Sequence, residues 1–339
     1  VAPAALAPGM TLLSPDPQPP AGFQRLGQRI DQAQWRTGLA MDLALSHVQM
    51  AVHQGQLYVL GGTKREDTRS PPQAQVWRTT PGADDWEVLN DLPTARTLGG
   101  AVVLGEDLYL VAGGDGSGSP LLQNLRYEIA SDSWTPVADL PQAYVDAAIC
   151  GLDGRIYVIG GVRDGLIVGD AVVYDAATDA WSPIAALPQP LTSIEAVGVD
   201  GRVFVLGGFG NGGHRNRGLA YDPATDSWTP IAPMPTPVLS AAATATDDGL
   251  IWVIGGEENG WARPDTMVYD PAADSWSFGP PLRHKRSGLA AASDGSTIHV
   301  AGGQYNHSAF NGAAFNIWFY LNGVEQLTPR PLYLHQRQP

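Results

Sequence analysis

The residues best suited to acid–base chemistry in this sequence are two carboxylates, Asp146 and Glu195, in segments otherwise rich in small residues. His47 and Gln49 stand in a corresponding segment nearer the start of the chain. Sister segments place Ala, Gly or Ser at these positions, so burying a carboxylate there costs free energy unless a partner or water compensates it. Three interpretations stay open: the polar lining of a solvated channel, contact with a ligand or partner, and acid–base catalysis.

The other chemistry-bearing residues form no catalytic or metal-binding pattern. None of the seven histidines has metal-ligand spacing, and the sequence lacks a phosphate-binding Gly-rich motif and a Gly-x-Ser-x-Gly nucleophile motif. The single cysteine, Cys150, lies in an apolar segment and is expected to be buried and inert. We therefore expect no cofactor and no stoichiometric metal ion.

One pattern occurs six times along the chain. An apolar run, a Gly-containing turn and a second apolar run ending in a glycine doublet are followed by a variable loop, a Tyr-Asp strand and a Trp. The doublets fall at Gly61-Gly62, Gly113-Gly114 (where Ala112 takes the first aligned position), Gly160-Gly161, Gly207-Gly208, Gly255-Gly256 and Gly302-Gly303. This period of about 47 to 52 residues fits four strands per unit. Pairs such as Tyr174 and Trp181 are seven residues apart, which places them on neighbouring strands where they can pack between units.

These features resemble the kelch-repeat family, whose units are the four-stranded blades of a β-propeller. The resemblance covers about residues 32–332 and implies an all-β, six-bladed kelch-type propeller with four-stranded antiparallel blades. Residues 1–31 are then an Ala/Pro-rich leader or linker and residues 333–339 a C-terminal tail. The sequence departs from the pattern in the end blades, where Trp77 replaces the Tyr, His299 replaces the second-strand aromatic and Leu327 stands at the sixth Trp position.

The spacing of Trp35 predicts how the ring closes. Trp35 precedes Gly61 by 26 residues, the same interval that separates Trp134 from Gly160. We expect residues 34–41 to supply the outer strand of the sixth blade, paired with its third strand near residues 317–320, so that no long edge is exposed. A C-terminal strand around Leu327 is the alternative.

Two further groups of residues are expected on one end of the propeller, the loop face. These are the residues just before each first strand and the loops that follow the diglycines. At least nine of the 20 basic residues fall there, and Arg with aromatic residues is typical of binding surfaces. A solvated rim is the alternative interpretation. The candidate binding residues are Arg96, Tyr144, Arg163, Arg215, Trp261, Arg286, Tyr305 and His307.

Composition narrows the function classes. With 34 acidic and 20 basic residues the net charge is −14, which disfavours nucleic-acid binding, and no apolar stretch is long enough to span a membrane. The Ala/Pro-rich start and the presence of only two lysines, Lys64 and Lys285, favour an extracytoplasmic protein, although a trimmed sequence boundary would look the same. The leading interpretation is a non-enzymatic binding or scaffolding propeller that makes a protein–protein contact or is a peripheral subunit of a larger extracytoplasmic assembly.

The alternative function is a carbohydrate-active propeller. Among kelch-type enzymes, a copper-radical oxidase is disfavoured because the chain lacks a Tyr-His pair and its one Cys lies in a core segment. A mutarotase-like or lectin-like activity is compatible with the sequence. The resemblance then makes Asp146 and Glu195 the acid–base candidates.

Overall fold

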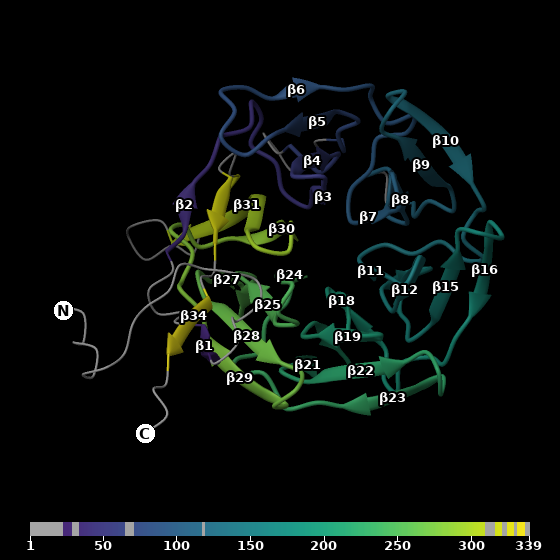
Figure 1. Cartoon of the computed structure of the whole chain (residues 1–339). Helices are drawn as coiled ribbons and strands as arrows, with labels where there is room; N and C mark the ends of the chain where they lie inside the picture. Colours follow the sequence, from purple (N-terminus) through teal and green to yellow (C-terminus); the bar gives the residue numbers. More distant parts are fainter. Residues whose placement is uncertain are drawn as a thin grey trace.

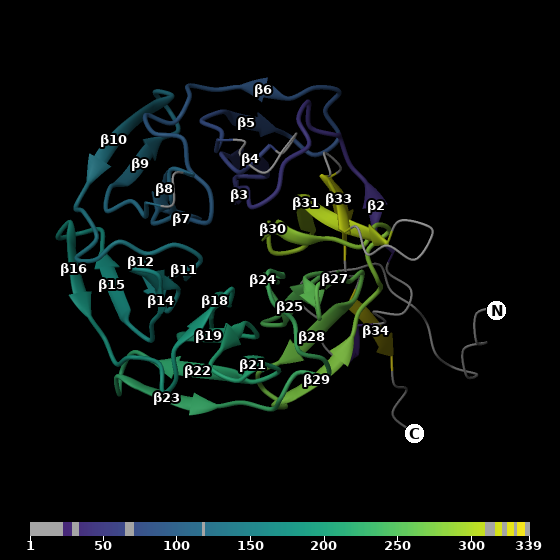
Figure 2. The same cartoon turned by 180° about the vertical axis from the view of Figure 1, so that it is seen from behind.

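The computed structural model describes residues 23–28, 34–64, 71–116, 119–308, 316–320, 324–328 and 331–335. Within these ranges the chain forms strands and turns and no helix. Six sheets are arranged around a central axis, and each sheet runs outward from a first strand at the axis to a fourth strand at the rim (Figure 1 and Figure 2). The predicted six-bladed β-propeller is confirmed.

Each blade is an antiparallel sheet whose four strands follow one another outward. The first strands are β3 (Gln49–His53), β7 (Gly100–Leu104), β11 (Ala148–Leu152), β18 (Glu195–Val199), β24 (Ala242–Ala245) and β30 (Ser287–Ser293). The second strands are β4 (Gln56–Leu60), β8 (Asp107–Val111), β12 (Arg155–Ile159), β19 (Arg202–Leu206), β25 (Ile251–Ile254) and β31 (Ile298–Ser308). The third strands are β5 (Val76–Thr79), β9 (Asn124–Glu128), β15 (Ala171–Asp175), β22 (Gly218–Asp222), β28 (Thr266–Asp270) and β33 (Glu325–Leu327). The fourth strands are β6 (Glu87–Val88), β10 (Ser133–Val137), β16 (Ala180–Pro183), β23 (Ser227–Pro230), β29 (Ser275–Phe278) and β2 (Arg36–Thr37).

Shorter strands lie outside the regular blades. The loops that follow the diglycines contain β13 (Val162–Arg163) with β14 (Leu166–Ile167), β20 (Phe209–Gly210) with β21 (Gly213–His214), and β26 (Glu257–Glu258) with β27 (Trp261–Ala262). β17 (Leu191–Thr192) pairs with β20, and β32 (Asn316–Tyr320) pairs with the end of β31. β1 (Phe23–Gln28), which lies within the predicted leader, pairs with β34 (Pro331–His335), which spans the predicted boundary between propeller and tail.

The glycine doublets join each blade to the next. Gly62 has a φ of +86°, and its N–H donates to the carbonyl of Arg96 in the following blade at 3.0 Å. A Cβ on Gly61 would lie 2.5 Å from that same carbonyl oxygen, so a side chain cannot be accommodated there without a shift. The equivalent bond occurs in every blade, with the acceptor carbonyls on Tyr144, Leu191, Val238, Arg286 and Leu45. The repeated doublet therefore allows neighbouring blades to pack closely and to hydrogen-bond to each other.

The repeated spacing of Tyr and Trp also joins neighbouring blades, near their outer strands. The Tyr174 hydroxyl donates to Asp179 at 2.7 Å, and the ring lies against Trp181 with centroids 5.1 Å apart. The Trp181 indole N–H then donates to the carbonyl of Ala138 in the preceding blade at 2.9 Å. Trp134, Trp228 and Trp276 make the same inter-blade bond. Six apolar clusters fill the interfaces between neighbouring blades, so the hydrophobic core is divided among these interfaces.

The ring is closed by the N-terminal strand, as predicted, but the partner strand differs from the prediction. β2 pairs with β33, whereas residues 316–320 pair with the extension of β31. The Trp35 indole donates to the carbonyl of Pro280 at 2.9 Å, which is the same inter-blade bond made by the other tryptophans. Leu327 pairs with Ile298 and therefore occupies the Tyr position, not the sixth Trp position. The prediction failed because the sixth blade carries an insertion after its second strand.

A second register correction concerns the first blade. Thr79 pairs with Leu57, the position that Tyr174 takes opposite Ile156, so Thr79 and not Trp77 replaces the Tyr. His299 does occupy the aromatic position of the second strand and is buried, with no hydrogen-bond partner for either ring nitrogen. It lines a cavity of about 300 Å³ at the seam between the sixth and first blades, where the Trp86 indole N–H also has no partner.

Candidate functional site

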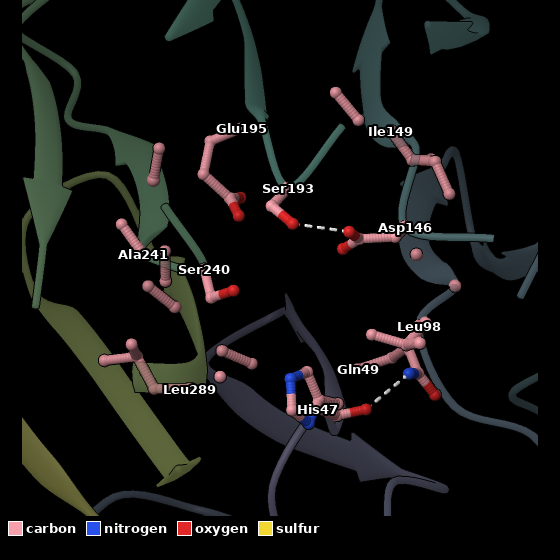
Figure 3. Close-up of a pocket in the computed structure, with 18 of the residues that line it drawn as sticks. His47, Gln49, Leu98, Asp146, Ile149, Ser193, Glu195, Ser240, Ala241 and Leu289 are labelled. Carbon is pink, nitrogen blue, oxygen red and sulfur yellow. Dashed lines mark hydrogen bonds between the residues drawn. The ribbon is translucent and has the colours of Figure 1, made fainter. Parts of the chain in front are cut away.

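The first strands of the six blades surround a central cavity of about 160 Å³. Its wall consists mostly of the small residues expected near the axis, because six strands converge there and leave little room. Four polar residues predicted from the sequence, His47, Gln49, Asp146 and Glu195, all line this cavity. The structure therefore brings together side chains from the first, third and fourth blades (Figure 3).

Six residues in equivalent positions form the loop-face end of the cavity, and we call them the entrance ring. All six have φ values between 50° and 59°, a conformation that costs energy for residues other than glycine. Backbone hydrogen bonds link five successive pairs around the ring, such as His47 N–H to the Gly288 carbonyl at 2.6 Å and Ser193 N–H to the Asp146 carbonyl at 3.3 Å. The entrance ring consists of His47, Leu98, Asp146, Ser193, Ser240 and Gly288. These bonds hold the ring side chains in fixed directions.

Asp146 is the best-anchored polar group of the cavity. Its carboxylate accepts a hydrogen bond from the Ser193 hydroxyl at 2.5 Å (Figure 3). It also accepts one from the Thr192 hydroxyl at 2.8 Å. Both donors belong to the fourth blade, so the carboxylate ties two blades together at the axis. Ser193 was treated in the sequence as one of the small residues of the repeat, and only its position beside Asp146 distinguishes it.

Glu195 lies deeper in the cavity, at the start of β18 (Figure 3). Desolvation within the narrow cavity raises the pKa of its carboxyl group to about 8, and the nearby Asp146 charge adds to this effect, while a hydrogen bond from the Ala243 backbone opposes it. Burial lowers the pKa of His47, and the Asp146 charge partly offsets that shift. Near neutral pH the cavity thus holds a carboxyl group able to donate a proton and a neutral imidazole able to accept one.

The expected loop-face residues do not all lie at the surface. Arg96, Tyr144 and Arg286 are buried between blades, contrary to the expectation that Arg96 and Arg286 lie outside the blade cores. Arg286 donates to Glu325 at 2.6 Å and to the Gly302 carbonyl at 3.0 Å. Arg96 donates to the carbonyls of Gln123 and Ala112 at 3.0 and 3.4 Å, and burial lowers the pKa of its guanidinium to about 10. The burial of Arg286 could not be predicted from the sequence because its partner Glu325 lies 39 residues away.

The remaining predicted residues lie in or beside the loops that follow the diglycines. Arg163 pairs with Asp170, and Trp261 is 44% exposed with the Lys285 ammonium 5.9 Å from its ring centre. Arg215 and Tyr305 are half-buried, and the side chain of His307 lies outside the described residues. Short backbone pairings such as Val145 with Val162 bring these loops next to the segments that precede the first strands, so both groups share one end of the propeller.

Three large apolar residues that were not predicted from the sequence are exposed on this same end, together with the predicted Trp261. Leu166 is 68% exposed, and each of four successive blades contributes one exposed large apolar residue from the loop that follows its diglycine. We call this set the apolar arc, and it comprises Leu122, Leu166, Phe209 and Trp261. Equivalent loop positions could have been compared in the sequence only after the hairpins β13–β14, β20–β21 and β26–β27 were known.

Within the described residues no group of three or more His, Cys, Asp or Glu side chains is arranged to hold a metal ion. Cys150 is buried in the third-blade core, and burial raises its pKa to about 12, which keeps the thiol protonated as expected. Among the described residues no helix has the length and apolar character needed to cross a membrane.

Comparisons with known proteins agree with this architecture. A family model described as KLHDC2/KLHL20/DRC7 Kelch-repeats domain matches residues 138–303. Kelch-like protein 41 of Mus musculus is 30% identical over 131 residues, which cover 38% of this chain and 22% of that protein. Kelch-like protein terF of Aspergillus terreus is 29% identical over 143 residues, covering 38% of this chain and 30% of that protein. The chain spans less than a third of the length of either relative.

A solved structure titled "Structure of YjhT" matches with a TM-score of 0.67 and 15% identity, covering 82% of this chain and 95% of that one. At this identity the likeness concerns the fold alone. Repeats, blade geometry and sequence relatives together define the class: a six-bladed β-propeller built from kelch repeats. The matched segment is just under half of this chain, and its repeats are similar to those of kelch-repeat domains.

Proposed function

We propose that this protein is a non-enzymatic binding or scaffolding propeller that contacts a protein partner through its loop face, as a peripheral subunit of a larger extracytoplasmic assembly. The apolar arc is the observation that carries the proposal. Four exposed apolar side chains come from the loop-face loops of four successive blades; Lys285 lies 5.9 Å from the ring centre of Trp261, and Arg163 pairs with Leu166 in β13–β14. Contiguous exposed apolar surface with Arg and aromatic residues is typical of protein interfaces.

The test is co-purification from the native source with matched surface variants. Leu166→Ser and Trp261→Ser should each reduce capture of a stoichiometric partner, because truncating an interface anchor commonly costs about 1 to 3 kcal/mol. Phe278→Ser is the control, since Phe278 is 58% exposed but lies on the rim strand β29. Partner capture that survives both arc variants but is lost with Phe278→Ser would contradict the choice of face.

The extracytoplasmic placement rests on composition. Residues 1–20 are rich in Ala and Pro with no charge before Asp16, and the whole chain contains two lysines. Cell fractionation of the native source with an antibody against the propeller tests this placement. Recovery of the protein in the cytoplasmic fraction alone would contradict it.

A second candidate function, mutarotase-like or lectin-like carbohydrate binding, is favoured by the central cavity. Glu195 supplies a protonated carboxyl group, Asp146 a fixed carboxylate, and the serine hydroxyls of the entrance ring supply further hydrogen-bonding groups for a polar ligand. Calorimetric titration with a glycan panel tests this function. Saturable binding that is lost with Glu195→Ala would support it, and a panel without binding would leave the protein-binding propeller as the function.

A further inference from the structure

A groove of about 410 Å³ lies on the outer part of the fourth blade, away from the central cavity. It runs between the connection that follows β16 and the strands β22 and β23. Leu191, Leu219 and Trp228 form apolar surface within it, and Pro188 and Pro230 border it. Proline rings are rigid and offer no N–H, so the walls present apolar surface that loses little conformational entropy when covered.

Two arginines, Arg215 and Arg217, complete the lining of this groove. Arg215 donates to the carbonyl of Asn211, while its Nε is buried without a hydrogen-bond partner. Arg217 is exposed, and within the described part of the chain neither guanidinium has a carboxylate partner. No acidic residue lines the groove.

The pair lies in a chain with a net charge of −14. Several other surface arginines have carboxylate partners, as Arg126 does with Asp107 at 2.8 Å and Arg263 with Asp265 at 2.7 Å. A buried Nε without an acceptor loses the hydrogen bond it would make with water. A carboxylate entering the groove would meet both guanidinium groups and could accept hydrogen bonds from their accessible N–H groups.

We propose that this groove binds an extended peptide segment of the protein partner in which an acidic side chain adjoins leucine or proline. The acidic side chain meets Arg215 and Arg217, and its apolar neighbours cover Trp228 and the proline walls. This inference rests on the proposed function, since the groove would add a side-chain-specific subsite beside the apolar arc. Phe209 of the arc belongs to the strand pair β20–β21, which directly precedes Arg215.

The probes are two acetylated and amidated pentapeptides labelled with a fluorophore, Pro-Leu-Glu-Leu-Pro and its Gln counterpart, measured by fluorescence anisotropy with the full chain. We expect the Glu peptide to bind about tenfold more tightly than the Gln peptide. In the double variant Arg215→Gln/Arg217→Gln the ratio should fall to about one, because the carboxylate then has no cationic partner. Arg155→Gln, which removes an arginine paired with Asp175 elsewhere, should leave the ratio unchanged.

Three outcomes would overturn the inference: no binding of the Glu peptide at about 1 mM, equal affinity for both peptides, or a ratio that survives in the double variant. Octanoate serves as a control for binding of a free apolar carboxylate. Saturable binding of octanoate without binding of the peptide would also reject a peptide ligand. Failure here is distinguishable from failure of the proposed function. Partner capture that depends on Trp261 but not on the two arginines would retain the interface and reject the groove.

Discussion

Replacing Arg286 by methionine should destabilise the propeller far more than the same replacement of Arg96. Both arginines precede a first strand at equivalent places in the repeat, and both are almost fully buried. Arg286 is paired with the buried Glu325 at 2.6 Å, whereas Arg96 donates to backbone carbonyls. Arg286→Met would therefore remove the buried cation of Glu325 and leave its carboxylate with the Arg283 N–H at 2.9 Å and the exposed His284 ring at 3.3 Å, whereas Arg96→Met would deprive no carboxylate of a partner.

The expected magnitudes follow from this difference. Breaking a buried ion pair by removing one partner costs about 3 to 5 kcal/mol, which corresponds to a fall in melting temperature of about 6 to 10 °C for a domain of this size. Loss of the Arg96 hydrogen bonds should cost about 1 kcal/mol. Leu45 and Leu191 occupy the same place in other blades, so an apolar side chain of this size can be accommodated.

Thermal and urea unfolding of both variants provide the assay. The double variant Arg286→Met/Glu325→Leu is the decisive control, because replacing both charges by apolar side chains should recover most of the lost stability. The reasoning would be refuted by an Arg286→Met melting temperature within about 2 °C of the parent, or by an equal loss in Arg96→Met. The first result would mean that the buried charge of Glu325 is compensated without Arg286, and the second that the loss of stability does not depend on a carboxylate partner.

Deleting residues 1–42 removes β2 and Trp35, so the melting temperature should fall by many degrees and the exposed edge of β33 should promote association. Deleting residues 1–22 should do little. Calorimetry and light scattering measure both effects, and an unchanged melting temperature for the longer deletion would contradict N-terminal closure. His299→Phe should stabilise the protein by about 1 to 2 kcal/mol, because it replaces two unpaired buried nitrogens at a position where sister blades carry aromatic rings. Burial lowers the pKa of His299, so the unfolded state binds the extra proton as pH falls through about 6.5. The parent protein should therefore lose stability on acidification more steeply than His299→Phe. An equal dependence of the free energy of unfolding on pH in both proteins, from about pH 7.5 to 5, would contradict this. The pKa of Glu195 is raised to about 8, so its protonated form favours the folded state and that contribution is lost as pH rises toward 8. The stability of Glu195→Gln relative to the parent should therefore increase between about pH 5 and pH 8. A difference in stability that does not change with pH would show that Glu195 is solvated. Elemental analysis of the purified protein should find no stoichiometric transition metal, and one copper or zinc per chain would contradict the prediction.

The fold could be predicted from the sequence because its determinants are local and repeated. The second aligned position is glycine in all six blades and has a φ between 86° and 100°, so the same residue recurs at each inter-blade contact, whereas the first aligned position accepts Ala112 in the second blade. The interval from Trp35 to Gly61 predicted closure for a similar reason, since Trp35 makes the same inter-blade bond as the other tryptophans. Where the repeat is interrupted, as in the insertion before β33, the register assignment was wrong.

The candidate site also has features that could be predicted from the sequence and features that could not. The sequence by itself determined that Asp146, Glu195, His47 and Gln49 depart from the small residues of the repeat, and the structure gathers all four around one cavity. It could not determine which arginines are exposed, because burial depends on partners from distant blades: Glu325 holds Arg286 inside the core, while Arg215 and Arg217 have no such carboxylate. The contacts that recur in every blade depend on residues within each repeat, so the sequence predicts them. The pairing of charges and the apolar arc arise only when six repeats form a ring.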